Sequence, residues 1–270
     1  MGSEDASPAF DALGYRFTLE CDDSEVLAHL TRLFSGLRVD DANAPSDAAA
    51  LPFEPSVADP AQALVNLVGH VNVCSLETAK GDVLVHSGCV ADDQGRAVLV
   101  CGPPGSGKST LTAELVRRGL AYVTDEVTSI DPIDLRITPF RKPVSLREGS
   151  HSVHPWLRPP PGSVADRLSG HHWLVAPDQL GGAELPGRPI FPSLVVLPTH
   201  TPGTTARVSE VPLSEATYLV GANSTQLGDV TGGCLPALAR VARRVRCVRL
   251  AYAEVGDAAD LVAPLLTEAA

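Results

Sequence analysis

Residues 101–110 read Cys-Gly-Pro-Pro-Gly-Ser-Gly-Lys-Ser-Thr, and this stretch decides the fold. Residues 102–109 match the pattern G-x-x-x-x-G-K-[ST], in which backbone amides surround a phosphate. The apolar run before it predicts a buried strand over 97–101, and the residues from Lys108 onward predict a helix with one apolar face. A strand, a glycine-rich loop and a helix in this order predict a site for a nucleoside triphosphate.

Each residue type in this loop has an expected role. Glycines let consecutive N–H groups point inward, Lys108 reaches the β- and γ-phosphates, and the Ser109 hydroxyl binds Mg²⁺. We therefore expect ATP and Mg²⁺ as cofactors. The alternative is a chance match in a chain with 23 Gly and 23 Pro. The residues expected to contact the nucleotide are Gly102, Pro104, Gly105, Ser106, Gly107, Lys108, Ser109 and Thr110.

Composition limits the classes of function. With 270 residues, 44% hydrophobic and 20% charged, the chain suits one large globular domain or two modest ones. The net charge of −11 argues against nucleic-acid binding through a broad basic surface. No apolar run approaches the roughly 20 residues of a membrane span, so no membrane association is expected. The N-terminus lacks the features of a signal peptide, which predicts a cytoplasmic protein. A homo-oligomer stays open.

Two regions are expected. Residues 1–75 predict a small α+β region with a Pro/Ala-rich linker near 40–60, and residues 76–270 predict a kinase domain built around the glycine-rich loop. In the first, the pattern predicts a strand over 15–19 and helices over 24–37 and 61–74.

The second region begins with a hairpin signature. Two strands, over 83–90 and 97–101, are separated by Asp-Asp-Gln-Gly, so an antiparallel partner precedes the loop strand. The expected fold class is therefore α/β with a mixed sheet. Residues 150–192, rich in Pro, Gly and His, predict either a lid or an irregular insert. Further strands are expected over 120–123, 127–130, 193–197 and 245–252, and helices over 213–220, 235–244 and 257–266.

An acidic pair follows the strand predicted over 120–123. Strand, loop, helix and strand form a βαβ unit, so the two strands should run parallel and Asp125 should lie near Lys108. One carboxylate of Asp125 and Glu126 can hold Mg²⁺ together with Ser109, and Asp125 can accept the proton of an attacking hydroxyl. The alternative is that the pair caps a turn and faces water.

Basic side chains supply further candidates. His86 lies in the strand beside the loop strand, where it either faces the phosphates or is a hydrogen-bonded core residue. Arg141, Lys142 and Arg147 concentrate positive charge in one segment. They are candidates for contact with substrate or phosphate, and a solvated basic edge is the alternative.

These motifs in this order resemble the HPr kinase/phosphorylase-like family, in particular its shorter bacterial relatives, some of which accompany peptide-modification pathways. The resemblance is carried by Leu-Val-His at 84–86, the loop at 102–110, Arg-Arg-Gly at 117–119 and Thr-Asp-Glu at 124–126, with a looser match at 141–146. It covers the central part of the chain. The Glu-Ile-Arg-Gly-type signature of the true HPr kinases is absent, and Glu126 stands where the family usually has Asp.

The resemblance implies a nucleotide domain with a mixed sheet, like the C-terminal domain of HPr kinase, and ATP in the glycine-rich loop. It implies that Asp125 is the catalytic base toward a seryl hydroxyl and that His86 lies near the phosphates. The missing signature speaks against HPr itself as the substrate and against the reverse phosphorylase reaction.

The resulting hypothesis is an Mg-ATP-dependent kinase acting on a Ser/Thr-type hydroxyl of a peptide or protein, with Asp125, Lys108 and His86 as catalytic residues. Two alternatives remain at this point. One is a kinase for a small molecule that carries a hydroxyl, and the other is a regulatory ATP-binding module without catalysis.

Overall fold

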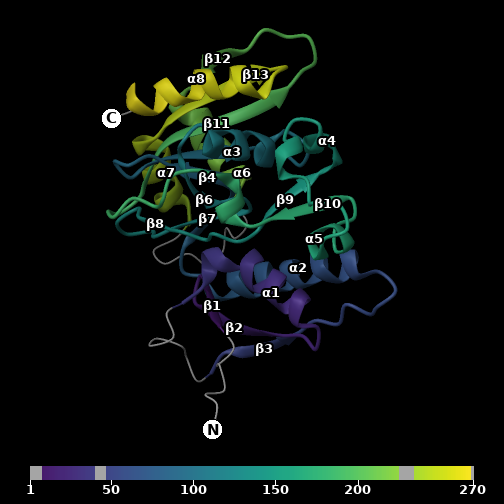
Figure 1. The fold of residues 1–270 in the computed structure, drawn as a ribbon. Coiled ribbons are helices and arrows are strands. Elements are labelled where there is room, and N and C mark those ends of the chain that lie inside the picture. Colours follow the sequence, from purple (N-terminus) through teal and green to yellow (C-terminus); the bar gives the residue numbers. More distant parts are fainter. Residues whose placement is uncertain (1–7, 40–46, 225–233, 269–270) are drawn as a thin grey trace.

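A computed structural model describes residues 8–39, 47–224 and 234–268 of the chain. It is an α/β structure built on one large mixed sheet, which carries helices on both faces, and a smaller N-terminal unit (Figure 1). No helix in the described ranges has the length and apolar character needed to cross a bilayer.

The N-terminal unit is a three-stranded sheet covered by helices. Its strands are β1 (Ala9–Ala12), β2 (Tyr15–Glu20) and β3 (Ala49–Pro52), with β2 antiparallel to β1 and parallel to β3. The helices are α1 (Ser24–Leu33), the short 3₁₀ helix η1 (Ser35–Leu37) and α2 (Pro60–Thr78). Strand β3 lies inside the stretch that we expected to be a linker, because Leu51 is buried in the core of this unit. Residues 40–46 of that stretch lie outside the described residues.

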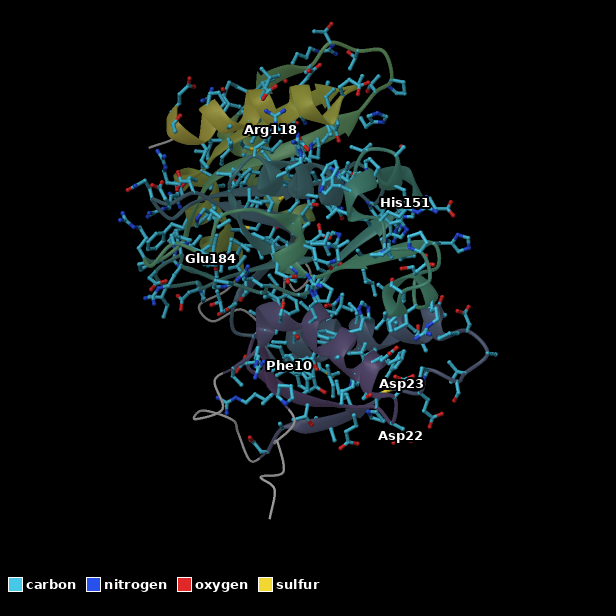
Figure 2. The ribbon with its side chains drawn as sticks, viewed as in Figure 1. Phe10, Asp22, Asp23, Arg118, His151 and Glu184 are labelled. Atoms are coloured by element: carbon cyan, nitrogen blue, oxygen red, sulfur yellow. The ribbon has the colours of Figure 1, made fainter. Side chains whose placement is uncertain are left out.

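Both helices begin at aspartate caps. Asp23 accepts hydrogen bonds from Glu25 N and Val26 N, and Asp59 accepts one from Gln62 N, so the first amides of α1 and α2 have partners. Phe10, labelled in Figure 2, is fully buried in this unit and packs on Phe17 and Phe34. Figure 1 shows α1 and α2 between the small sheet and the rest of the molecule.

The large sheet has the order β12-β13-β11-β5-β4-β7-β8, with β6 also pairing with β4. The central strands are β4 (Val83–Ala91), β5 (Arg96–Cys101) and β11 (Phe191–His200). Around them lie β6 (Ala121–Thr124), β7 (Val127–Ile130), β8 (Ile137–Thr138), β12 (Arg207–Glu210) and β13 (Arg246–Tyr252).

The hairpin of β4 and β5 is confirmed, since the two strands pair antiparallel. Strand β6 is also antiparallel to β4, so β5 and β6 run parallel, as expected for the βαβ unit. They are not neighbours, however, because β4 lies between them. On its other side β5 pairs parallel with β11, which pairs parallel with β13, so the sheet is mixed.

Helices cover the two faces of this sheet. One core lies under α3 (Lys108–Arg117) and α8 (Val255–Glu268), and the other lies under α6 (Leu213–Ala222) and α7 (Cys234–Arg244). The glycine-rich loop connects β5 to α3, so its position is fixed by a buried strand on one side and a buried helix face on the other.

The expectation of a lid or an irregular insert over 150–192 named no helices or strands, but the segment from 144 to 192 contains both. It contains a two-stranded sheet of β9 (Val144–Arg147) and β10 (His172–Val175). Short helices accompany it: α4 (Glu148–His151), η3 (Pro155–Leu157), α5 (Val164–Arg167) and η4 (Pro177–Leu180). The His151 ring stacks on the Trp173 ring, with 3.7 Å between the ring centroids. Local contacts of this kind hold the segment, although its sequence has no long pattern of periodic apolar residues.

Candidate active site

The site is a cavity of about 1060 Å³ at the edge of the sheet where β5, β11 and β13 end. The glycine-rich loop and the first turn of α3 form its floor. Glycine is needed at 107 for two reasons: its φ is +94°, and a Cβ there would overlap the hydroxyl of Tyr252. The loop is therefore packed directly against the end of β13.

Lys108, the first residue of α3, is buried at the floor of this cavity. Its Nζ donates to Gly102 O at 2.7 Å and to Pro103 O at 3.3 Å, so the ammonium is held inside the loop. Burial lowers the pKa of Lys108, and the nearby carboxylates of Asp125 and Glu126 oppose that shift. The ammonium is thus partly desolvated beside two acids, a position in which a polyphosphate would be strongly attracted.

The register of the strands explains why the acidic pair reaches the loop. Cys101, the last residue of β5, pairs with Ser87 on β4, and Ser87 N donates to Glu126 O on the other side of β4. The residues that connect β6 to β7 therefore lie beside the end of β5. Strands β4 and β7 extend beyond the end of β5, so there is open space next to the glycine-rich loop.

Asp125 is the most perturbed acid of the site. Only 5% of it is exposed, and its Oδ1 is buried with no hydrogen-bond partner. Burial raises the pKa of Asp125 to about 6, while Lys142, the Ser109 hydroxyl and the Ser145 amide favour the charged form. A buried carboxyl group in a cavity wall, with a raised pKa and one oxygen without a partner, is a candidate to accept a proton or to help hold a cation.

Glu126 and His86 form a second layer beside Asp125. The His86 ring Nδ1 lies 2.9 Å from Glu126 O and 3.6 Å from Glu126 Oε1. Both side chains are partly exposed and line the cavity. His86 is therefore both hydrogen-bonded and open to the cavity, so the two expectations for this residue are not exclusive.

Only one of the three basic candidates in the 139–149 segment lines the cavity. Arg147 does so, with its side chain exposed. Lys142 is 1% exposed, donates to Pro143 O at 3.1 Å and lies 3.8 Å from Glu126 Oε2. The Nε of Arg141 is buried without a partner. The prediction that Arg141 and Lys142 contact substrate or phosphate is therefore not supported, because their segment is covered by the N-terminal unit.

The structure adds wall residues that sequence reasoning missed. On one side, His200 and the segment 252–256 line the cavity, from the ends of β11 and β13 and the start of α8. Ligands bind at the carboxyl ends of parallel strands. This rule, applied to the strands predicted over 193–197 and 245–252, could have found these residues. On the other side, Ser145, Ser150 and Trp156 line it, and nothing in their sequence spacing indicates this.

The loop that carries Ser150 is fastened to α3. Ser150 Oγ lies 2.7 Å from Thr110 Oγ1, and His154 Nε2 lies 2.9 Å from Thr110 O. His154 is fully buried, so this part of the segment is packed against α3. At the other end of α3, Arg118, labelled in Figure 2, pairs with Asp260 and contacts Gly256 O on α8. Helix α3 is thus held on both sides of the cavity.

Among the described residues, no three His, Cys, Asp or Glu side chains gather in the arrangement of a metal site. A Mg²⁺ ion in this cavity would thus rely on ligands other than a protein cage, as is usual when it accompanies a phosphate. Ser109 and Asp125 fit that use, because both are oxygen donors beside the loop and Asp125 Oδ1 lacks a partner.

A scan against models of protein families finds none that matches this chain, and a search of curated proteins finds no match either. The function therefore has to be argued from the site.

Proposed function

We propose that this chain is an Mg-ATP-dependent kinase that transfers the γ-phosphoryl group to a hydroxyl of a peptide or protein. The observation that carries this proposal is Asp125, a buried carboxylate with an unpartnered oxygen in the same cavity as Lys108 and Ser109. Binding of a triphosphate needs the loop and the lysine alone. A base beside them is the additional group that transfer to a hydroxyl requires.

The donor half is formed by the loop and the first turn of α3. The loop amides and the helix N-terminus favour phosphate oxygens, and the Lys108 ammonium neutralises charge on the β- and γ-phosphates. Mg²⁺, held with the help of Ser109 and Asp125, would further neutralise the phosphates. These interactions stabilise the charge that develops on the leaving group.

The acceptor half is formed by Asp125. The acceptor oxygen forms a bond to the γ-phosphorus, the bond from that phosphorus to the β,γ-bridging oxygen breaks, and ADP leaves. The proton of the hydroxyl goes to the Asp125 carboxylate. Arg147 lines the cavity, and in the part of the chain that the structure describes it has no carboxylate partner, so its guanidinium is available to the transferring group.

The sequence resemblance to HPr kinase/phosphorylase-like proteins supports the same proposed function. It assigns the base to Asp125 and the phosphate loop to residues 102–110. Burial of Asp125 and of Lys108 in one cavity agrees with those roles.

The test uses purified protein, Mg-ATP and a library of synthetic peptides with one serine each, followed by peptide mass and ADP release. We expect a gain of one phosphate on peptide. Lys108→Ala should lose ATP binding, measured by calorimetry. Asp125→Asn should bind ATP but transfer roughly 10²–10⁴-fold more slowly, which is the contribution of a general base.

The alternatives give different results. Phosphate gain on small alcohols but on no peptide would indicate a small-molecule kinase. Tight ATP binding with no transfer to either class would indicate a regulatory binding module. Unimpaired transfer by Asp125→Asn would disprove the role of Asp125.

A further inference from the structure

The cavity measures about 1060 Å³, which is at the upper end of the range of about 300–1,000 Å³ for pockets that enclose a single drug-sized ligand. Its walls come from two separate parts of the chain. Residues of β11, β13 and α8 form one wall, and residues 145–156 with Arg117 form the other. The question is which molecule each wall receives.

The order of the strands in the large sheet determines in which direction a bound triphosphate extends across the cavity. In the proposed kinase the γ-phosphate lies toward Asp125, and Asp125 follows β6, which is on the β4 side of β5. The nucleoside must then extend to the opposite side of β5, over the ends of β11 and β13. His200 and residues 252–256 line the cavity there. The wall around Trp156 remains for the acceptor.

Trp156 is an exposed aromatic ring that is held in place. It is 49% exposed, and the Arg117 guanidinium lies over its ring, 5.5 Å from the centroid. The buried His154 ring meets it edge-on at 4.7 Å. Arg117 is itself fixed by the buried carboxylate of Glu114, at 2.8 Å from Nε. An apolar ring in this setting offers a rigid surface for another apolar or aromatic group.

We infer that Trp156 is a specificity subsite for the acceptor, and that it receives an apolar or aromatic side chain of a polypeptide. This inference rests on the proposed function. The ring connects through His154 to Thr110, beside the phosphate loop. This path of contacts joins the Trp156 ring to the first turn of α3, which follows the phosphate loop.

The test measures phosphorylation of serine peptides in a glycine–alanine background. A single Phe is placed at each position from four residues before the serine to four after it. We expect Phe at one of these positions to raise kcat/KM roughly tenfold. Trp156→Ala should remove this preference, so that peptides with and without Phe give the same kcat/KM, and KM for ATP should rise less than tenfold. Trp156→Phe should keep most of the preference, and Tyr218→Ala, which removes an exposed aromatic on α6, should keep all of it.

Fluorescence reports binding at the same ring. The chain has two tryptophans, so Trp173→Phe leaves Trp156 as the only reporter. The matched Phe peptide should change its emission, and Mg-ATP alone should not. Three results would overturn the inference: a preference that survives in Trp156→Ala, the absence of any positional preference, or a tenfold rise of KM for ATP in Trp156→Ala. Failure of the proposed function would look different, since no peptide in the set would then gain phosphate, whether or not ATP binds.

Discussion

The burial of Asp125 has a cost in stability. Its pKa is raised to about 6 in the folded protein, from an ordinary value of 3.8. The folded state therefore holds the proton more tightly than the unfolded state between these two values. The free energy of unfolding falls as the pH rises through this window, and at neutral pH the buried charge costs about 3 kcal/mol.

We predict that Asp125→Asn, which stays neutral, is more stable than the wild type at pH 7.5 by up to about 3 kcal/mol. The difference should disappear near pH 4, where the wild-type carboxyl is protonated. Urea unfolding at the two pH values, without nucleotide or Mg²⁺, measures it. Asp93→Asn, in the exposed β4–β5 turn, is the matched control and should show no such pH dependence. A variant that is less stable than the wild type at pH 7.5 would contradict the prediction.

At the level of single residues, sequence reasoning located the loop, Asp125 and His86 because each lies in or next to a short, strongly patterned strand. It failed for Lys142, because burial of a lysine depends on what covers it. The sequence next to Lys142 cannot show that this side chain is 1% exposed and lies 3.8 Å from Glu126 Oε2. Trp156 was missed for the same reason, since its supports, Arg117 and His154, meet it through tertiary packing.

Helix α3 sits unusually close to β4. A Cβ added at Gly88 would overlap the hydroxyl of Thr112, which is buried and has no hydrogen-bond partner. The absence of a side chain at Gly88 therefore sets the distance between helix and sheet. Because α3 begins at Lys108, this contact also sets the height of the lysine above the strands.

We predict that Gly88→Ala destabilises the protein by about 1–3 kcal/mol, the usual cost of overpacking. It should also weaken ATP binding, because α3 must move. Thr112→Ala should be nearly neutral, since it removes an unpaired hydroxyl. The double variant should recover much of the loss, although the Thr112 Cβ would still lie 3.2 Å from the new Cβ. Denaturant unfolding of all four proteins gives the coupling, and simple additivity would contradict this account.

The elements that sequence reasoning found are those with long apolar runs or clear periodicity, such as the β4–β5 hairpin, α2 and α8. The short elements β9, β10 and η3 were not found. They are held by ring stacking and side-chain contacts such as His151 on Trp173 rather than by periodicity. The parallel direction of β5 and β6 was predicted correctly, but the insertion of β4 between them depends on pairing that the βαβ rule does not address.

At the scale of the whole molecule, the N-terminal unit contacts the segment that leads into β9 and also the region of α5, β10 and η4. A Cβ at Gly36 in η1 would overlap the carbonyl and Cβ of Arg141. Phe140 belongs to the core of the N-terminal unit, and Arg32 on α1 pairs with Asp178 at 3.2 Å. The segment that continues into β9, and so to Ser145 and Arg147, is thus clamped by this unit.

We predict that Gly36→Val lowers stability by about 1–3 kcal/mol and also lowers the transfer rate, because the overlap displaces the segment that leads into β9. Gly69→Ala in α2 is the matched control. A Cβ there meets nothing within 4 Å, so it should be neutral or raise stability by roughly 0.5–1 kcal/mol. Urea unfolding and hydrogen exchange of the β9 amides measure both. An unchanged exchange rate in Gly36→Val would disprove the clamp.

The positions of the site residues along the chain affect how such a protein can change its specificity during evolution. The loop, Lys108, His86 and the acidic pair all lie between the start of β4 and the end of β7. The wall that carries Trp156 lies in one later stretch, residues 145–156. Under the proposed function, descendants of a duplicated gene can acquire new acceptors by changes in that stretch alone, while the loop and the acidic pair stay intact.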